Sequence, residues 1–240
     1  MHSARQVSYV ARKKIVFIIV EGPSDEQALS VIFNRLYNLN QVHIEIMHGD
    51  ITTDLSLDPG SIVGAIGNII RNYAASMHFK QNDFQEVIHI VDMDGAFVPD
   101  SAIISDPQAD KPFYSSTEIR TARPEKLQLR NAHKQAVLNK ICSLDNVWVS
   151  IPYKVYYMSC NLDHALYGKL NSTDEEKERD SFIFAKRYKD DLGGFLSFIS
   201  ASEFSRVEGY KESWEFIKKD LHSLERNTNI GVCFKELLRK

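Results

Sequence analysis

The segment IVFIIVEGPSD, residues 15–25, decides the fold class of this chain. Its first six residues are all apolar and mostly β-branched or aromatic, and they are too few to cross a bilayer. Such a run without polar alternation is typical of a central parallel strand that is covered on both faces. A helical spacing of apolar residues follows, with Ser24 as the expected N-cap and Gln27 completing a capping box. We therefore predict a strand, a sharp turn at Gly22 and a helix.

The same pattern returns further along the chain. Val87–Val91 is a second apolar run of this kind, and Val42–Met47 and Tyr153–Met158 are expected to be further strands. Apolar stripes predict helices from Asp58 to Tyr73 and over Glu125–Ile141. An alternation of strands and helices indicates an α/β fold, with a mostly parallel sheet flanked by helices.

Acidic residues follow two of the predicted strands. Glu21 and Asp25 come after the first run, and Asp92 and Asp94 come after the run Val87–Val91. Ligands of open parallel sheets bind beyond the carboxyl ends of the strands, where these side chains are expected. Oxygen ligands in this number favour Mg²⁺ or Mn²⁺, and the absence of paired Cys or His spacing makes zinc a poor fit. The sequence thus predicts a hard-cation site suited to phosphate chemistry.

These motifs resemble the Toprim domain, the catalytic module of topoisomerases, primases and several nucleases. The residues that carry the resemblance are Glu21-Gly22 with Asp25, Asp92-x-Asp94, and a softer match at His48-Gly49-Asp50. The resemblance covers roughly residues 13–100 and the strand near residue 155, and the sequence around Glu21 is most similar to the OLD-family nucleases. It implies a Toprim-like, Rossmann-like fold.

The resemblance also implies roles for the acids. Asp92 and Asp94 would hold Mg²⁺ or Mn²⁺. Glu21 would act as general acid or base, and Asp25 would help to hold metal. Glu21 and Asp25 together would place a second metal or move protons. The alternative is that Asp25 holds no metal and only complements the dipole of the helix that follows.

Substrate contacts are expected from two further places. Gly22, Gly49 and Asp50 lie at predicted strand ends, where the backbone can approach a ligand. After Gly95 the chain is rich in proline and lacks periodicity, so we expect an irregular insertion at about residues 95–124. Basic residues gather in its last part and in the next helix: Lys111, Arg120, Arg123, Lys126, Arg130, His133 and Lys134. Arg120 and Arg123 are the candidate phosphate contacts, and a solvated helix face is the alternative for the residues from Lys126 onward.

Asp163 and His164 follow the last predicted strand and are candidate auxiliary groups at the crevice, although acids there also cap helices. The charged run Asn171–Asp180 is expected to be a solvated loop. We predict a catalytic core over residues 13–165 and a helical C-terminal extension over residues 166–240, packed on the core.

Composition narrows the protein class. The formal net charge of −3 argues against a basic coat, so nucleic acid would have to bind a local patch. We expect a cytoplasmic protein with no membrane partner. The three cysteines lack metal spacing, and the sequence shows no secretory signal and no long apolar segment.

The expected function is a Mg²⁺- or Mn²⁺-dependent nuclease that hydrolyses phosphodiester bonds of DNA or RNA. OLD-like members often act in bacterial phage defence beside an ATPase. This chain lacks a Gly-Lys-Ser/Thr phosphate loop, so an ATPase would be a separate partner.

Two alternatives remain open. Asp92-x-Asp94-Gly95 also resembles the nucleophile motif of haloacid-dehalogenase-type phosphatases, whose later acidic pair would have to be Asp190-Asp191. The other alternative is a non-catalytic module that binds a nucleotide or a phosphorylated ligand in the same crevice.

Overall fold

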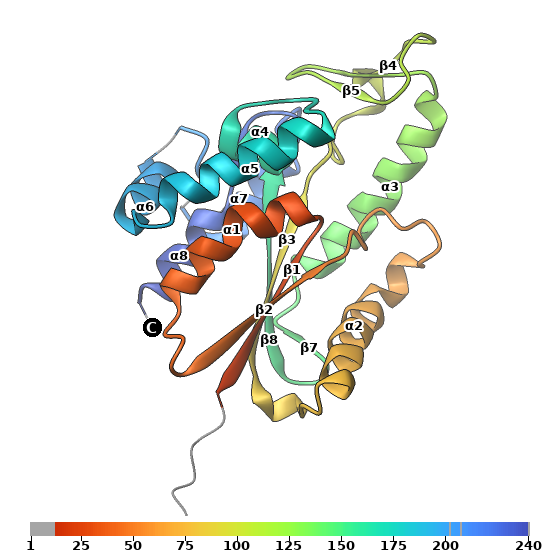
Figure 1. Ribbon diagram of the computed structural model, residues 1–240. Helices are drawn as coiled ribbons and strands as arrows, with labels where there is room; N and C mark the ends of the chain where they lie inside the picture. Colours follow the sequence, from red (N-terminus) through yellow and green to blue (C-terminus); the bar gives the residue numbers. More distant parts are fainter. Residues whose placement is uncertain (1–12, 202, 207, 240) are drawn as a thin grey trace, which may run out of the picture.

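A mostly parallel sheet forms the centre of the protein (Figure 1). The computed structural model describes residues 13–201, 203–206 and 208–239. Within these residues, six strands belong to the sheet, in the order β2-β1-β3-β8-β7 with β9 also paired to β8. They are β1 (Lys14–Val20), β2 (Val42–His48), β3 (Phe84–Asp92), β7 (Asn146–Val147), β8 (Ile151–Ser159) and β9 (Asn227–Thr228). The pairs β1–β2, β1–β3 and β3–β8 are parallel, whereas β7 and β9 run antiparallel to β8. The predicted α/β class with a mostly parallel sheet is confirmed.

Strand β1 is buried on both faces. Val16, Ile18 and Val20 belong to one apolar cluster. Ile15, Phe17 and Ile19 belong to a second cluster on the other face. Because successive side chains of a strand point to opposite faces, a continuous apolar run fits a strand with cover on both sides.

Helices supply this cover, as Figure 1 shows. One face packs against α1 (Pro23–Leu36), α4 (Leu162–Tyr167), α5 (Asp174–Tyr188), α6 (Leu192–Ala201) and α8 (Ile230–Leu237). The other face packs against α2 (Ile62–Ser76), α3 (Pro124–Ile141) and α7 (Tyr210–Ile217). Short 3₁₀ turns lie at η1 (Pro59–Ser61), η2 (Gln81–Asp83) and η3 (Asp100–Ala102). The helices expected at Asp58–Tyr73 and Glu125–Ile141 are present with small shifts of their ends.

The insertion after Gly95 is more ordered than its sequence indicates. It contains a small sheet of β4 (Ile103–Ser105), β6 (Ile119–Thr121) and β5 (Phe113–Tyr114), in that order. Strands of two or three residues are too short to show a period, so the sequence predicted an irregular segment. Ile119 packs with Leu224 from the C-terminal part, and this contact holds the small sheet against the core.

Two local expectations are wrong. The N-cap of α1 is Gly22, not Ser24, because Pro23 already takes the first helical position that its fixed φ favours. The run 171–180 is largely helical, because α5 begins at Asp174. Thr173 Oγ1 accepts a hydrogen bond from the Glu176 amide, and the Glu176 carboxylate accepts one from the Thr173 amide, so this end is capped reciprocally.

The C-terminal part completes the outer edge of β8. Strand β9 pairs with Met158 and Ser159 at one end of β8. Further along, Asn229 Oδ1 accepts a hydrogen bond from the Tyr157 amide at 2.8 Å, and the Val155 amide donates to the Tyr210 hydroxyl at 3.4 Å. Side chains thus replace a neighbouring strand over the middle of this edge.

Candidate functional site

The four predicted acids come together at the carboxyl ends of β1 and β3. Glu21 is the first residue after β1, Asp92 is the last residue of β3, and Asp25 lies in the first turn of α1. The Asp92 amide donates a hydrogen bond to Glu21 Oε1 at 2.9 Å, which links the two strand ends directly. The parallel pairing of β1 with β3 therefore joins motifs that are far apart in the sequence.

A small cavity lies between Asp25 and Asp92. Its volume is about 20 Å³, which is enough for one water-sized particle. It is lined by Ser24, Asp25, Asp92, Asn161, Leu162, Asp163 and Lys177. Asp92 Oδ1 accepts a hydrogen bond from the Leu162 amide at 2.9 Å, and Asp25 Oδ2 accepts one from the Gly22 amide at 3.0 Å. These bonds fix one oxygen of each carboxylate.

The carboxyl groups around this cavity resist ionisation. Burial raises the pKa of Asp92 well above its ordinary value, and the neighbouring charges of Glu21 and Asp25 raise it further. Burial also raises the pKa of Asp25 to about 6, although the Gly22 amide opposes the rise. The pKa of Asp163 is raised by burial as well. A cation in the cavity would favour the ionised forms, which makes the donor set suitable for one.

Lys134 organises the other side of the acid cluster. Its side chain is fully buried, and its ammonium lies 2.6 Å from Asp94 Oδ2 and 3.6 Å from Glu21 Oε1. Burial lowers the pKa of Lys134, but Asp94, Glu21 and Asp50 outweigh burial and raise it overall. Burial raises the pKa of Glu21 to about 8 in spite of the opposing charge of Lys134. Lys134 therefore stays charged and compensates these carboxylates.

The turn after β3 is held by α3. Asp94 has a φ of 48° and Gly95 a φ of 66°, which is the left-handed region that aspartate tolerates and glycine favours. A Cβ atom at Gly95 would lie 2.6 Å from Ile119 Cδ1, so a larger residue would displace the insertion. The Arg130 guanidinium donates to the Asp94 carbonyl at 2.7 Å, and the side-chain Nδ2 of Asn131 donates to the Gly95 carbonyl at 3.1 Å.

The segment after β2 also reaches this region. The Gly49 amide donates to the Val20 carbonyl at 2.8 Å, which places it beside the end of β1. Asp50 accepts hydrogen bonds from Thr52 and Thr53. Burial raises the pKa of Asp50, but Lys134 and these hydrogen bonds outweigh burial and lower it overall.

Gly22 lines a larger groove of about 490 Å³ between the first turns of α1 and α5. This groove shares Ser24 and Lys177 with the small cavity and so adjoins it.

The grouping of the acids differs from the one inferred from the sequence. Asp92 shares the small cavity with Asp25 and Asp163, whereas Asp94 is paired with Lys134. Among the residues that the structure describes, no three His, Cys, Asp or Glu side chains are arranged to hold a metal ion as they stand. Mg²⁺ commonly takes only one or two carboxylates and completes its shell with water and phosphate oxygens, which suits a pair such as Asp25 and Asp92.

The two auxiliary candidates separate. Asp163 lines the small cavity. His164 Nδ1 instead accepts a hydrogen bond from the Cys160 amide at 2.9 Å, and burial lowers the pKa of His164 to about 4. The imidazole is therefore neutral near pH 7 and braces the loop after β8.

The basic residues of the predicted stretch also lie in different places. Lys134 and Arg130 point inward to the acids and to the Asp94 carbonyl. Arg120 pairs with Glu118 at 2.6 Å. Arg123 lines an open groove at the start of α3. The internal role of Lys134 was missed, and the available signal was its spacing of four residues from Arg130, which puts both on one helix face.

The acidic pair required by the phosphatase alternative lies elsewhere. Asp190 and Asp191 connect α5 to α6, and Asp190 lies 3.9 Å from Arg35 at the end of α1. Arg35 is ten residues beyond Asp25 on that helix, or about 15 Å along its axis. Neither aspartate lines the small cavity.

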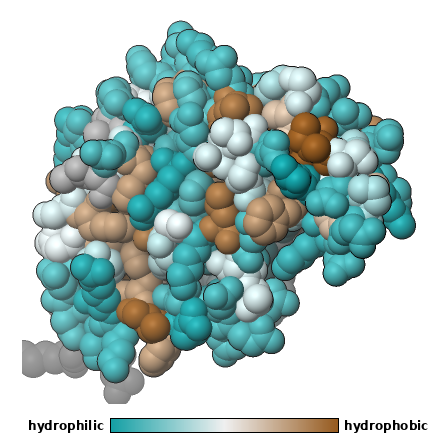
Figure 2. Space-filling view, turned by 90° about the horizontal axis from the view of Figure 1, so that it is seen from above, coloured by the Kyte–Doolittle hydropathy of each residue, from teal (hydrophilic) through white to brown (hydrophobic). Residues whose placement is uncertain are grey.

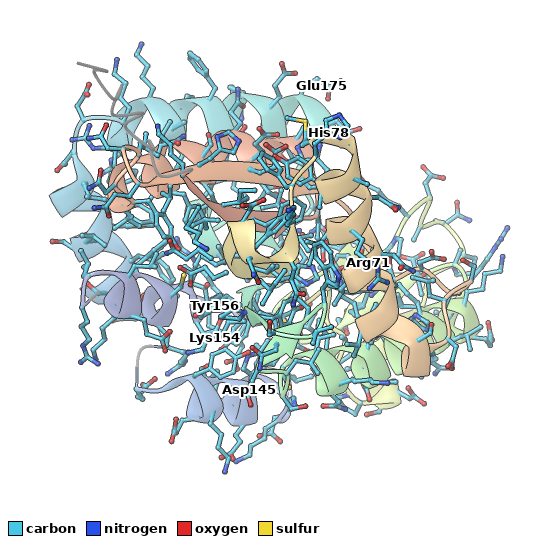
Figure 3. All side chains as sticks on the ribbon, turned by 90° about the horizontal axis from the view of Figure 1, so that it is seen from below. Arg71, His78, Asp145, Lys154, Tyr156 and Glu175 are labelled. Atoms are coloured by element: carbon cyan, nitrogen blue, oxygen red, sulfur yellow. The ribbon has the colours of Figure 1, made fainter. Side chains whose placement is uncertain are left out.

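The surface around the site is polar. Seen from above, over the carboxyl ends of the strands, it is predominantly hydrophilic with apolar residues scattered across it (Figure 2). Figure 3, from the opposite side, labels Asp145, Lys154 and Tyr156, which line a cavity of about 250 Å³ near the start of β8. Lys154 is already paired there with Glu236 at 2.7 Å, and none of the four acids lines this cavity.

Comparison with known proteins adds no assignment: no family model, no curated protein and no solved structure matches this chain. None of the helices in the described ranges has both the length and the apolar character of a membrane span.

Proposed function

We propose that this protein is a divalent-metal-dependent nuclease. The observation that carries the proposal is the convergence of Glu21, Asp25, Asp92 and Asp94 at the carboxyl ends of two parallel strands, beside a cavity of about 20 Å³. Crevices at this edge of a parallel sheet are the usual ligand sites of such folds. Three of these carboxyl groups, Glu21, Asp25 and Asp92, have raised pKa values, which makes this place a candidate for catalysis with a cation.

The proposed metal ligands are Asp25 and Asp92, with Asp163 nearby on the same cavity. Bound Mg²⁺ or Mn²⁺ would supply an activated water and neutralise charge on a phosphate. The hydrogen bonds from the Gly22 and Leu162 amides orient these carboxylates and leave one oxygen of each free of them.

Glu21 and Lys134 would handle protons and charge. A carboxyl group with a pKa of about 8 can give or accept a proton near neutral pH, which suits Glu21 to general acid or base catalysis. The buried ammonium of Lys134 is a fixed positive charge beside Asp94, where it can stabilise negative charge that develops on phosphate oxygens.

The Toprim-like assignment, the resemblance to OLD-family nucleases and the phage-defence role remain part of this proposal. They rest on the Glu21-Gly22, Asp25 and Asp92-x-Asp94 motifs. An ATPase partner is part of the same proposal, and residues 1–240 contain no Gly-Lys-Ser/Thr phosphate loop of such enzymes.

One observation favours a second candidate, a non-catalytic module that binds a phosphorylated ligand. Lys134 already compensates Glu21 and Asp94, so part of the acid cluster is balanced without a metal. Such a module would bind its ligand and leave it unchanged.

Cleavage assays distinguish the candidates. Labelled single- and double-stranded DNA and RNA are incubated with the protein in Mg²⁺, in Mn²⁺ and in EDTA. We expect metal-dependent cleavage that Asp92→Asn abolishes and Asp190→Asn, a change at an exposed aspartate, leaves intact. Equal cleavage by wild type and Asp92→Asn, or none on any substrate, would overturn the nuclease proposal.

A further inference from the structure

An open groove of about 520 Å³ lies between the insertion and the first turns of α3. It is lined by Ala109, Asp110, Lys111, Pro112, Thr121, Ala122, Arg123, Lys126, Leu127 and Arg130. Four of these residues are cationic and one is acidic. In a chain with a net charge of −3, this is a marked local excess of positive charge.

Three of the cations have no charged partner in the part of the chain that the structure describes. Within the described residues, no carboxylate lies within ion-pair distance of Lys111, Arg123 or Lys126, and all three are exposed. Arg120, by contrast, is paired with Glu118 and does not line the groove. The groove therefore presents uncompensated positive charge to solvent, which attracts anions.

Arg130 connects the groove to the acid cluster. It lines the groove, and its guanidinium donates to the Asp94 carbonyl at 2.7 Å and to the Tyr114 hydroxyl at 2.9 Å. Lys134, at the acid cluster, is eight residues beyond Lys126 on α3, or about 12 Å along the helix axis. The groove thus begins beside the acids and extends away from them along α3.

We propose that this groove binds the phosphate backbone of a nucleic-acid strand whose scissile bond lies at the acid cluster. The choice of nucleic acid rests on the proposed function. The groove would hold phosphates some two helical turns from the reacting phosphate and so fix the position of the cut relative to the bound strand. Lys111, Arg123 and Lys126 would contact phosphate oxygens. Arg130 would hold the groove at a fixed position relative to the acids.

The lining favours a backbone over a free nucleotide. Among the described residues, no aromatic side chain lines the groove, so it offers no ring on which a base could stack. Exposed lysine and arginine side chains suit phosphates, which they contact without reading sequence.

Binding is measured by fluorescence anisotropy with labelled oligonucleotides of several sequences, in Ca²⁺ to suppress cleavage, across a salt series. The test variant is Arg123→Ala with Lys126→Ala, and the matched control is Lys186→Ala with Lys219→Ala, two exposed lysines that do not line the groove. We expect the test variant to weaken binding equally for all sequences and to reduce the slope of log affinity against log salt by about 0.7 to 0.9 for each lost contact. The control variant should keep the wild-type slope. Arg123→Lys with Lys126→Arg should restore most of the lost slope, which excludes a folding defect.

The outcomes separate this proposal from the proposed function. Wild-type slopes in the test variant, with cleavage intact, would overturn the groove and leave the nuclease standing. A reduced slope in the test variant, with no cleavage by wild type, would support the groove and remove the nuclease. A test variant that binds pyrophosphate less tightly but binds oligonucleotides unchanged would make the groove a small-anion site and overturn the proposal.

Discussion

The ammonium of Lys134 lies 2.6 Å from Asp94 Oδ2, and the Lys134 side chain is fully buried while the Asp94 side chain is 22% exposed. The partner of a buried ammonium cannot lose its charge without a large cost, since no water is available to replace it. Among the described residues, Asp92 forms no ion pair, and burial together with the charges of Glu21 and Asp25 outweighs the more distant Lys134 and raises its pKa. Two aspartates that are two residues apart in one motif therefore have opposite effects on stability.

The first prediction separates these two aspartates. Asp94→Asn should destabilise the metal-free protein by about 3 kcal/mol, the lower end for a buried ion pair because Asp94 is 22% exposed, since it leaves the Lys134 charge poorly compensated. Asp92→Asn should leave stability unchanged or raise it, because it relieves carboxylate repulsion and keeps an oxygen that can accept from the Leu162 amide. Urea denaturation in EDTA measures both. Equal losses in the two variants would show that Lys134 does not depend on Asp94.

The second prediction concerns metal binding. Mn²⁺ titrated into the protein in a calorimeter should bind, and Asp25→Asn or Asp92→Asn should each remove most of that binding, because both carboxylates line the small cavity. Asp190→Asn is the control, since this side chain is 80% exposed. Unchanged Mn²⁺ affinity in Asp92→Asn would remove the proposed ligand set.

The third prediction concerns pH. The pKa of Glu21 is raised to about 8 and that of Asp25 to about 6, from ordinary values of 4.5 and 3.8. Between the ordinary and the raised pKa of each group, the folded protein binds more protons than the unfolded chain. The free energy of unfolding therefore falls as the pH rises through this range. Glu21→Gln, which cannot ionise, should gain stability relative to wild type between pH 5 and pH 8 in EDTA. Parallel pH profiles for the two proteins would contradict the raised pKa.

The fourth prediction addresses phosphoryl-aspartate chemistry. Beryllofluoride should form no adduct with Asp92, because the acidic pair which that chemistry requires lies at the α5–α6 junction. Fluorine NMR of the protein with beryllium, fluoride and Mg²⁺ is the measurement. A bound beryllofluoride signal that Asp92→Asn removes, together with turnover of a phosphomonoester, would favour the phosphatase alternative.

The sequence predicted most of what positions the site. A continuous apolar run indicates a buried parallel strand whatever its exact residues are. Strands β1 and β3 and the acids at their ends could therefore be found from local pattern alone. The N-cap at Gly22 was misplaced by two residues, because Ser24 and Gln27 form an equally good local capping pattern.

The parts that failed depend on contacts between distant residues. Lys134 is one of seven basic residues in its stretch, and only the packing of α3 against the turn after β3 makes it internal. Asp163 was expected near the crevice, but its place beside Asp25 and Asp92 depends on α4 following β8, a neighbour of β3. No period or spacing in the sequence carries that information.

The edge of β8 has a consequence for shortened forms of the protein. Strand β9, Asn229 and Tyr210 together satisfy the backbone of β8 at that edge. A chain that stops before Tyr210 would keep every residue of the acid cluster but would leave a long, apolar strand with open hydrogen-bonding groups. Such an edge is a template for strands of other molecules, so a chain shortened in this way should aggregate. The C-terminal part thus covers the edge at which β8 would otherwise pair with another molecule.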